Sequence, residues 1–444
     1  MKKRSAILSF FLILIFVLSP VAASAYDITG SGFTITSKVA LLVSLDTGEI
    51  IYSTDKDSDT VKTTDQKYQP AALTNLMTAV VVLENCEDID TQVTVTSDEI
   101  DPLLGTGAAV AGLKEDEKIT VRSLLHLILM GSAADASNVL ADFIGGDIDS
   151  FVAMMNEKAA DLSMDSTHFV NAHGLSEDNQ YTTANDLYKL AKYALDLPMI
   201  MEICEKTRYD LPQTNQNSAR VVSTTNMLID PTTSYYYTYA KGMKTGYSSE
   251  SGRCLISTAS KDGYNYMCII LGGDNATRSE FTDSENLYRW VFDEYEYRKV
   301  ADTATQIGEM EVELAWDTDY IQLFPEQDVS AIVPKNIDNS SIRYELVTDQ
   351  SVWAPVEKGE IMGKAVIYCA ENQIGEVNVV AGETIKRNQL LFIAKIFNII
   401  VTSKIFIGFV VVLVLLLIGL IVTNIFHQKR KRGRNKKVKP IRKL

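Results

Sequence analysis

Cysteine and histidine are scarce in this chain, with five and four among 444 residues. No cysteine belongs to a C-x-x-C pair, and the histidines lack the spacing of a metal site. These absences argue against zinc-binding and disulfide-framework proteins, and we expect no metal and no cofactor. A single disulfide stays open as an alternative, although the odd count leaves at least one thiol unpaired. The cysteines are Cys86, Cys204, Cys254, Cys268 and Cys369.

Long apolar runs are confined to the two ends of the chain. The N-terminus reads Met1-Lys2-Lys3-Arg4, continues with an apolar stretch from Ala6 to Leu18 and reaches Ala23-Ser24-Ala25. This order of parts is typical of a secretory signal cleaved after a small residue. We therefore expect residues 1–25 to be a signal peptide and the protein to be exported.

The second apolar run, Ile405 to Phe426, contains no charged residue and is long enough for a helix to cross roughly 30 Å of hydrocarbon. Beyond it, residues 427–444 hold ten Lys and Arg residues and no acid. Such an excess of basic residues predicts a cytoplasmic tail. We expect a single-pass transmembrane helix over 405–426, in the cell membrane, with the globular part extracellular.

The segment 388–404 before this run supports two interpretations. It is largely apolar, but Lys395, Asn398 and Thr402 recur at positions i, i+3 and i+7. Such a stripe suits an amphipathic juxtamembrane helix at the membrane surface. Alternatively, the segment lengthens the transmembrane helix.

The exported part is strongly acidic. Without the three basic residues of the signal and the ten of the C-terminal segment, the formal charge falls from −15 to −28 on residues 26–404. This sign argues against nucleic acid as a partner. One membrane anchor, a basic inner tail and no outer-membrane feature indicate a Gram-positive bacterium.

Residues 26–300 show the pattern of an α+β domain. Val39–Val43 and Ile50–Tyr52 predict a hairpin around Gly48, and Thr120 predicts the N-cap of a helix. Further expected helices run from Pro70 to about Glu84, with Ala72 in the first turn, and over 136–144 and 151–162. Expected strands cover 239–245, 254–260 and 266–271, and the last two are joined by a turn at Lys261-Asp262-Gly263. Short alternating segments over 305–382 predict a small all-β domain.

Six segments occur in an order that resembles the D-alanyl-D-alanine carboxypeptidases, which are low-molecular-weight penicillin-binding proteins of peptidase family S11. They are Ser44–Gly48, Pro70–Ala79, Leu124–Ala136, Phe169–Leu175, Tyr181–Leu187 and Gly242–Tyr247. The resemblance covers roughly residues 35–380. It implies the fold class α/β (α+β), a β-lactamase/DD-peptidase-like domain whose antiparallel sheet is flanked by helices.

The resemblance also implies a chemistry, and the chain departs from it. In the family, a Ser-x-x-Lys motif supplies the nucleophile and the lysine that helps to deprotonate it, and Ser-x-Asn and Lys-Thr-Gly complete the site. Here Ala72 and Asn75 stand for the first pair, and Ala134 stands for the asparagine. Methyl and carboxamide groups cannot perform those steps, so the sequence predicts a pseudoenzyme.

Four other positions match the family motifs and predict substrate binding. They are Ser132, Lys244, Thr245 and Gly246. The resemblance implies that the lysine and threonine hold the terminal carboxylate of a peptide. The alternative is that the triplet serves only a strand and its turn. For His173, between Ala172 and Gly174, we expect a hydrogen bond that fixes a turn.

Three functions follow from these observations. The first is a pseudoenzyme that binds peptidoglycan stem peptides ending in D-Ala-D-Ala, or a cell-wall protein partner. The second is an active D-Ala-D-Ala carboxypeptidase in which Ser132, aided by Lys244, replaces the missing nucleophile. Thr74 and Thr78 are poor substitutes, since on a helix they point roughly 200° and 240° away from Ala72. The third is a purely structural or interaction protein of the cell envelope.

Overall fold

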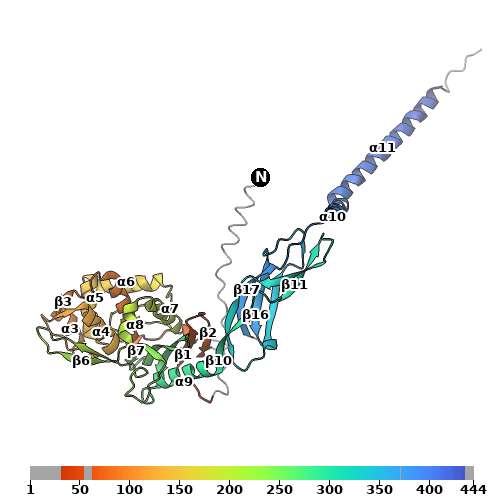
Figure 1. Cartoon of the computed structure of the whole chain (residues 1–444). Helices are drawn as coiled ribbons and strands as arrows, with labels where there is room; N and C mark the ends of the chain where they lie inside the picture. The colour runs from red at the N-terminus through yellow and green to blue at the C-terminus, as the bar shows by residue number, and fades with distance from the viewer. Residues whose placement is uncertain (1–31, 55–62, 371, 436–444) are drawn as a thin grey trace, which may run out of the picture. The chain divides into compact units, whose positions relative to one another are not determined.

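The computed structural model describes residues 32–54, 63–370 and 372–435, which form two compact units (Figure 1). Unit 1 runs up to Arg298 and includes Ala331–Asp338, whereas unit 2 comprises Lys299–Ser330 and the residues from Asn339 onward. The expected signal peptide, 1–25, lies outside the described residues, as does the end of the expected basic tail, 436–444.

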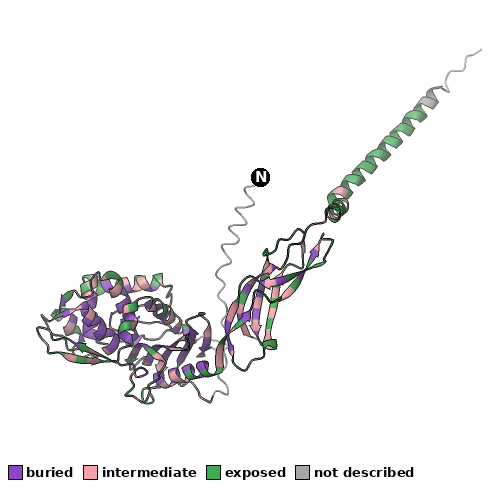
Figure 2. Cartoon of the chain, in the orientation of Figure 1, coloured by how far each residue is buried: buried purple, intermediate pink, exposed green. Residues whose placement is uncertain are grey.

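A five-stranded antiparallel sheet in the order β2-β1-β9-β8-β7 forms the centre of unit 1. Its strands are β1 (Val39–Ser44), β2 (Ile50–Ser53), β7 (Ala240–Ser248), β8 (Gly252–Lys261) and β9 (Tyr264–Gly273). Alternate residues of β1 enter two different hydrophobic cores, with Val39 and Leu41 in one and Ala40 and Leu42 in the other. Because both faces are covered, β1 is buried throughout and its first five residues are all apolar (Figure 2).

Helices cover both faces of this sheet. The larger core packs a group of helices against one face: α2 (Thr74–Asn85), α4 (Val121–Gly131), α5 (Ala134–Gly145), α6 (Ile148–Asp161), α7 (Ala184–Leu195) and α8 (Pro198–Cys204). The second core places α9 (Ser279–Glu294) on the other face. The remaining short elements of unit 1 are η2 (Thr63–Asp65), η3 (Ala71–Leu73), α3 (Ser97–Ile100), η4 (Asp101–Leu103), and the strand pairs β3 (Gln92–Thr94) with β4 (Lys118–Thr120) and β5 (Arg208–Leu211) with β6 (Arg220–Ser223).

Local sequence chemistry explains several boundaries that the sequence predicts. Gly48 turns the β1–β2 hairpin at φ +76°, which a glycine adopts without steric cost. The Thr120 side chain accepts the backbone N–H of Ser123, so it caps α4 as expected. Asp262 and Gly263 both have positive φ in the turn between β8 and β9.

The expected helix from Pro70 is observed with Ala72 in its first turn, but that turn has 3-10 geometry. Ala71 has φ +49°, which a right-handed helix cannot contain, and residues 71–73 form the 3-10 turn η3. The α-helix α2 begins only at Thr74. The backbone is right-handed at both Leu73 and Thr74, so η3 runs into α2 without a break and Ala72 lies in the turn just before Asn75.

Unit 2 contains a six-stranded sheet in the order β14-β16-β17-β12-β11-β15. Its strands are β11 (Gly308–Glu313), β12 (Tyr320–Pro325), β14 (Ile342–Thr348), β15 (Ser351–Trp353), β16 (Ile361–Cys369) and β17 (Asn372–Ala381), with η5 (Asn339–Ser341) before β14. All pairings are antiparallel except that of β11 with β15. A separate two-stranded sheet joins β10 (Tyr295–Ala301) and β13 (Val329–Pro334), and both strands have residues in each of the two units. The expected all-β region is thus observed.

Two helices end the described chain. Helix α10 (Gln389–Thr402) stops at Ser403, whose extended backbone separates it from α11 (Lys404–Asn435). The segment is therefore a helix of its own and does not continue α11 unbroken. The stretch Lys404–Arg430 is long and apolar enough to cross a membrane, and its side chains are exposed (Figure 2).

Candidate functional site

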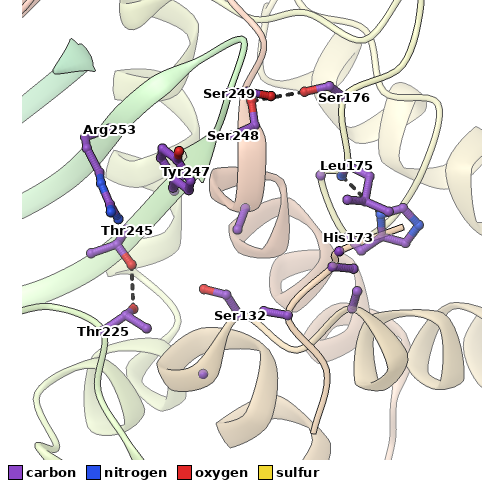
Figure 3. A pocket seen from close by; sticks show the side chains of 18 of the residues that line it. Ser132, His173, Leu175, Ser176, Thr225, Thr245, Tyr247, Ser248, Ser249 and Arg253 are labelled. Atoms are coloured by element: carbon purple, nitrogen blue, oxygen red, sulfur yellow. Dashed lines mark hydrogen bonds between the residues drawn. The ribbon is translucent and has the colours of Figure 1, made fainter. Parts of the chain in front are cut away.

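A pocket of about 1060 Å³ lies in unit 1 (Figure 3). Five of the positions compared with the family motifs line it together: Ala72, Ser132, Ala134, Thr245 and Gly246. They come from η3, the end of α4, the start of α5 and strand β7. The fold thus gathers segments more than 170 residues apart around one cavity. Asn75 and Lys244 do not line the cavity and lie behind its wall.

The turn that carries Ala72 is held in an unusual backbone conformation. Ala71 occupies the left-handed region at φ +49°, and its carbonyl accepts the Thr74 hydroxyl at 2.8 Å. A Cβ on Gly174 would lie 1.9 Å from that carbonyl oxygen, so only glycine fits there. Strained backbone of this kind persists only where the surrounding structure enforces it.

The threonines near Ala72 have other partners. Thr74 bonds to the Ala71 carbonyl as described, and the Thr78 hydroxyl donates to the Ala172 carbonyl at 2.6 Å. Both side chains are buried, and neither lines the pocket. Neither hydroxyl can therefore take the place of one at Ala72, and their bonding adds to the angular argument from the sequence.

His173 fixes a turn at the pocket wall. Its Nδ1 accepts the backbone N–H of Leu175 at 3.1 Å (Figure 3), the type of bond that the sequence predicts. Burial lowers the pKa of His173 to about 4, so the ring is neutral at physiological pH. The turn also packs Gly174 against Ala71, which links this segment to the position of Ala72.

Asn75 is fully buried and makes one hydrogen bond. Its Nδ2 donates to the Ile128 carbonyl of α4 at 3.1 Å, and its Oδ1 has no hydrogen-bond partner among the described residues. Ala134, in the first turn of α5, contributes only a methyl group to the pocket. This side of the cavity, which we call the helix side (Ala72, Asn75 and Ala134), offers no nucleophile and no base.

Ser132 is a hydroxyl side chain that lines the same cavity. It caps α4 in the left-handed conformation, at φ +57° and ψ +37°, which turns the chain from α4 into α5. Lys244 donates from Nζ to Ser132 Oγ at 2.5 Å and to the Thr245 carbonyl at 2.8 Å. A charged lysine in this position leaves the Ser132 proton free to be donated into the cavity.

Lys244 is completely buried, which changes its acid–base behaviour. Desolvation lowers its pKa from 10.5 to about 7. Near neutral pH the amine is thus present in both forms. The charged form donates to Ser132, whereas the neutral form can accept a proton from it.

Two threonine hydroxyls extend this polar wall. Thr245 Oγ1 and Thr225 Oγ1 are hydrogen-bonded at 2.5 Å, and both residues line the cavity (Figure 3). We call Ser132, Thr225 and Thr245, with Lys244 behind them, the strand side. It presents hydroxyl donors backed by an amine, which suits an anionic oxygen ligand.

Gly246 has a packing role. A Cβ there would lie 3.2 Å from the Leu73 nitrogen and 3.3 Å from the Pro70 carbonyl oxygen. Strand β7 therefore approaches the η3 turn more closely than a larger residue allows. This observation supports the structural explanation for the glycine of the triplet, and it says nothing against a binding role for Thr245.

The sequence did not point to several residues of the site. Thr225 follows β6 without a motif, and Arg253 and Arg278 become pocket residues only because β8 and the start of α9 lie near β7. Arg253 stacks over the Tyr247 ring at 4.1 Å, and Arg278 pairs with the buried Glu280 at 2.8 Å. No motif spacing in the sequence predicts these contacts.

Cys86, Cys204, Cys254 and Cys268 are free thiols, so the single disulfide left open by the sequence does not form. Burial raises the pKa of the Cys204, Cys254 and Cys268 thiols to about 12, which makes them unreactive. Within residues 32–54, 63–370 and 372–435, no group of three potential ligands is placed to hold a metal ion.

Comparison with known proteins identifies both units. Residues 24–275 match the family described as D-alanyl-D-alanine carboxypeptidase, peptidase S11, and residues 295–387 match the C-terminal domain of penicillin-binding protein 5. The first match covers more than half of the chain.

Individual relatives agree with these matches. D-alanyl-D-alanine carboxypeptidase DacF of Bacillus subtilis is 25% identical over 79% of this chain and 86% of its own length. DacD of Escherichia coli is 28% identical over 72% and 81%. The crystal structure of DacD from Francisella tularensis aligns with a TM-score of 0.64 at 21% identity, covering 84% of this chain and all of that one.

Proposed function

Because this chain belongs to the D-alanyl-D-alanine carboxypeptidase family, peptidase S11, and to peptidoglycan metabolism, we propose that it is a membrane-anchored member that binds its ligand without cleaving it. The ligand is a peptidoglycan stem peptide ending in D-Ala-D-Ala. A protein partner in the cell wall is the alternative occupant. The contrast between the two sides of one pocket carries this proposal.

The helix side accounts for the proposed lack of catalysis. Ala72 stands where the family has its serine, and its methyl group cannot attack a carbonyl. Asn75 stands for the lysine, and its amide is held by the Ile128 carbonyl and cannot act as a base near neutral pH. Removing a covalent nucleophile typically costs several powers of ten in rate.

The strand side accounts for the proposed binding. Ser132, Thr225 and Thr245 offer hydroxyls to a terminal carboxylate, and the charge of Lys244 strengthens the bond that Ser132 donates. Strand β7 is the last strand of its sheet, so its free edge can pair with an extended peptide. Recognition of a peptide end then needs no residue of the helix side.

The C-terminal helix α11 supports the proposed anchoring. Its apolar stretch is exposed and spans Lys404–Arg430, and the basic residues after Phe426 favour a cytoplasmic C-terminal end. Unit 1 is then extracellular, where peptidoglycan is found.

Two measurements on the purified protein test the proposal. Incubation with a fluorescent penicillin is expected to leave no covalent label, because acylation needs the missing hydroxyl. Calorimetry with an N-acylated peptide ending in D-Ala-D-Ala is expected to show binding. The same peptide with a C-terminal amide should bind more weakly, since it lacks the carboxylate.

A labelled band that disappears on competition with unlabelled penicillin would refute the proposed inactivity. If the acid and the amide peptides bind equally well, the strand side does not recognise the terminal carboxylate, and that part of the proposal is refuted. If neither peptide binds, the protein serves a structural or interaction role instead.

The bond between Lys244 and Ser132 favours a second candidate function, hydrolysis by Ser132. Neutral Lys244 would take the hydroxyl proton while Oγ bonds to the carbonyl carbon of the penultimate D-alanine. The departing D-alanine amine would take up a proton as its bond breaks, and water would then release the acyl group from Ser132. The short Nζ–Oγ distance and the lowered pKa of Lys244 support this step.

Release of D-alanine from a pentapeptide distinguishes the two candidates. Under the second candidate, purified protein releases D-alanine and Ser132→Ala abolishes the release. Ala72→Gly is the matched control, because it changes the other side of the pocket and should leave that activity intact. No release from the wild type leaves the binding function alone.

A further inference from the structure

Two of the three tryptophans of the chain are exposed at one end of unit 2. Trp316 is 74% exposed and Trp353 is 42% exposed, whereas Trp290 of unit 1 is 7% exposed. Trp353 lies opposite Glu313 in the pairing of β15 with β11, and Trp316 follows Glu313 by three residues. Both indoles therefore lie near the end of β11.

Helix α10 is attached to this same end. Lys395 donates from Nζ to Glu313 at 2.5 Å, and the backbone N–H of Asn388 donates to the Leu314 carbonyl at 2.7 Å. The pKa of Glu313 is lowered, chiefly by the hydrogen bond from Lys395 and also by bonds from the Ser351 and Trp353 side chains. Glu313 thus pairs with Trp353 in the sheet and binds α10 through Lys395.

The other face of α10 is apolar and exposed. Leu390, Ile393, Phe397 and Ile400 recur at i, i+3, i+7 and i+10, and each is at least half exposed. Lys395 points roughly 200° away from Ile393, so the helix binds Glu313 with one face and leaves the apolar row uncovered. This arrangement is typical of a helix that lies in a membrane interface.

The distance to the proposed membrane span is short. From Lys395 to Thr402 the helix axis rises about 10 Å, and α11 begins two residues later. Whatever the angle at Ser403, the end of β11 stays within reach of the point where the chain enters the bilayer. An apolar row facing the lipid places Lys395, Glu313 and Trp353 on the outward side of α10, at the depth of the headgroups.

The residue types match that depth. Tryptophan is enriched at membrane–water interfaces, because the ring is apolar and the indole N–H needs a polar partner. Asp317 and Asp319 follow Trp316 directly and disfavour deeper insertion. A headgroup layer accommodates both kinds of side chain, whereas an apolar protein groove would have to bury the acids.

We propose that Trp316 and Trp353 anchor the end of unit 2 in the headgroup layer of the bilayer that α11 crosses. The inference depends on the proposed anchoring by α11 and adds a second membrane contact to it. Its consequence is that unit 2 is held at the membrane surface rather than attached to it only through a hinge at Ser403.

Quenching by brominated phospholipids tests the proposal on the full chain reconstituted in phosphatidylcholine vesicles. Three variants keep one tryptophan each, the other two being replaced by phenylalanine. For the Trp316 and Trp353 variants we expect fluorescence loss that is greater with bromines near the headgroup than with bromines at mid-chain. The Trp290 variant is the matched control and should keep its fluorescence with both lipids.

Flotation of the vesicles separates the two possible failures. If the chain does not float with the vesicles, the anchoring is wrong and this inference falls with it. If it floats but the exposed tryptophans are quenched no more than Trp290, the anchoring stands and the headgroup contact is refuted. A protein partner would also give that second result, with Trp316 shielded from solvent only when the partner is added.

Discussion

The two sides of the pocket differ in what their side chains can do. On the helix side, Ala72 and Ala134 present methyl groups, and the Asn75 amide is directed to a backbone carbonyl. On the strand side, Ser132 and Thr245 present hydroxyls, and a buried amine backs them. Both sides belong to one well-packed unit. The difference teaches that the architecture of a site and its chemistry are separable. On the helix side, close backbone contacts hold the position of Ala72, although its side chain has no reactive atom.

The largest effect is expected from giving the helix side reactive groups. In the triple variant Ala72→Ser, Asn75→Lys and Ala134→Asn, a hydroxyl and an amine share the centre, so acylation by penicillin should rise by several powers of ten. The measurement is covalent labelling with fluorescent penicillin, confirmed by the mass of the intact protein. Asn75→Lys alone is the control and should stay unlabelled. A folded triple variant without label would mean that more than these side chains separates the two sides.

The backbone of the helix side is tested at Gly174. In Gly174→Ala the new Cβ meets the Ala71 carbonyl oxygen at 1.9 Å, and the positive φ adds strain, so the free energy of unfolding should fall by about 3 kcal/mol. Urea denaturation measures it. Gly48→Ala is the matched control, because φ is also positive there but no atom lies within 4 Å, and its expected cost is about 1 kcal/mol. An equal decrease in the free energy of unfolding of the two variants would show that the η3 turn can shift at little cost to make room for the new Cβ.

The buried amine of the strand side predicts a pH dependence. The pKa of Lys244 is about 7 in the folded chain and 10.5 unperturbed, so the unfolded chain binds more protons between these values. Burial of charged Lys244 therefore lowers the free energy of unfolding by its full amount below pH 7. This loss of stability disappears as the pH rises towards 10.5. Between these values the free energy of unfolding should rise by at most about 1.4 kcal/mol per pH unit.

The buried thiols act in the opposite sense above about pH 9, because their pKa values are raised. The wild type is therefore compared with Lys244→Met. Both proteins contain the same buried thiols, so the thiol contributions cancel in the difference between their free energies of unfolding. The stability of the variant relative to the wild type should decrease from pH 7 to pH 9. A constant difference across that range would mean that Lys244 keeps its ordinary pKa.

The smallest effect is expected from one hydroxyl of the strand side. Thr245→Val keeps the shape of the side chain but removes a donor to the ligand carboxylate, which should weaken peptide binding roughly tenfold. Calorimetry with the D-Ala-D-Ala peptide measures the change. Thr348→Val, on β14 of unit 2, is the control and should bind like the wild type. Unchanged affinity in Thr245→Val would place the peptide elsewhere.

Several elements could be predicted because their cause is local. Gly48 and the Asp262-Gly263 pair mark hairpin turns, Thr120 marks a helix start, and alternating residues mark the strands of unit 2. The start of α2 could not be predicted in this way. Its boundary depends on the left-handed Ala71, which is held by contacts with Gly174 a hundred residues later.

The residues of the candidate site also fall into those that the sequence predicts and those that only the fold brings together. Motif spacing indicated Ala72, Ser132, Ala134 and Thr245, and they do share one cavity. The same spacing indicated Lys244, and the structure adds that its amine is buried and donates to Ser132 Oγ. Thr225 and Arg253 reach the cavity from segments without any motif, since only the packing of β6 and β8 beside the site brings them there.

The sequence by itself determined which atoms this protein has at each step of the expected chemistry, because a methyl group and an amide have the same limits in any fold. It also determined where the chain can turn, where it can start a helix and where it can cross a membrane, since these depend on neighbouring residues. Only the tertiary structure decided that Lys244 is buried against Ser132, with its pKa near 7. The same holds for Trp353, which meets α10 through Glu313. Burial and long-range contact arise from segments far apart in the chain, and no local pattern contains them.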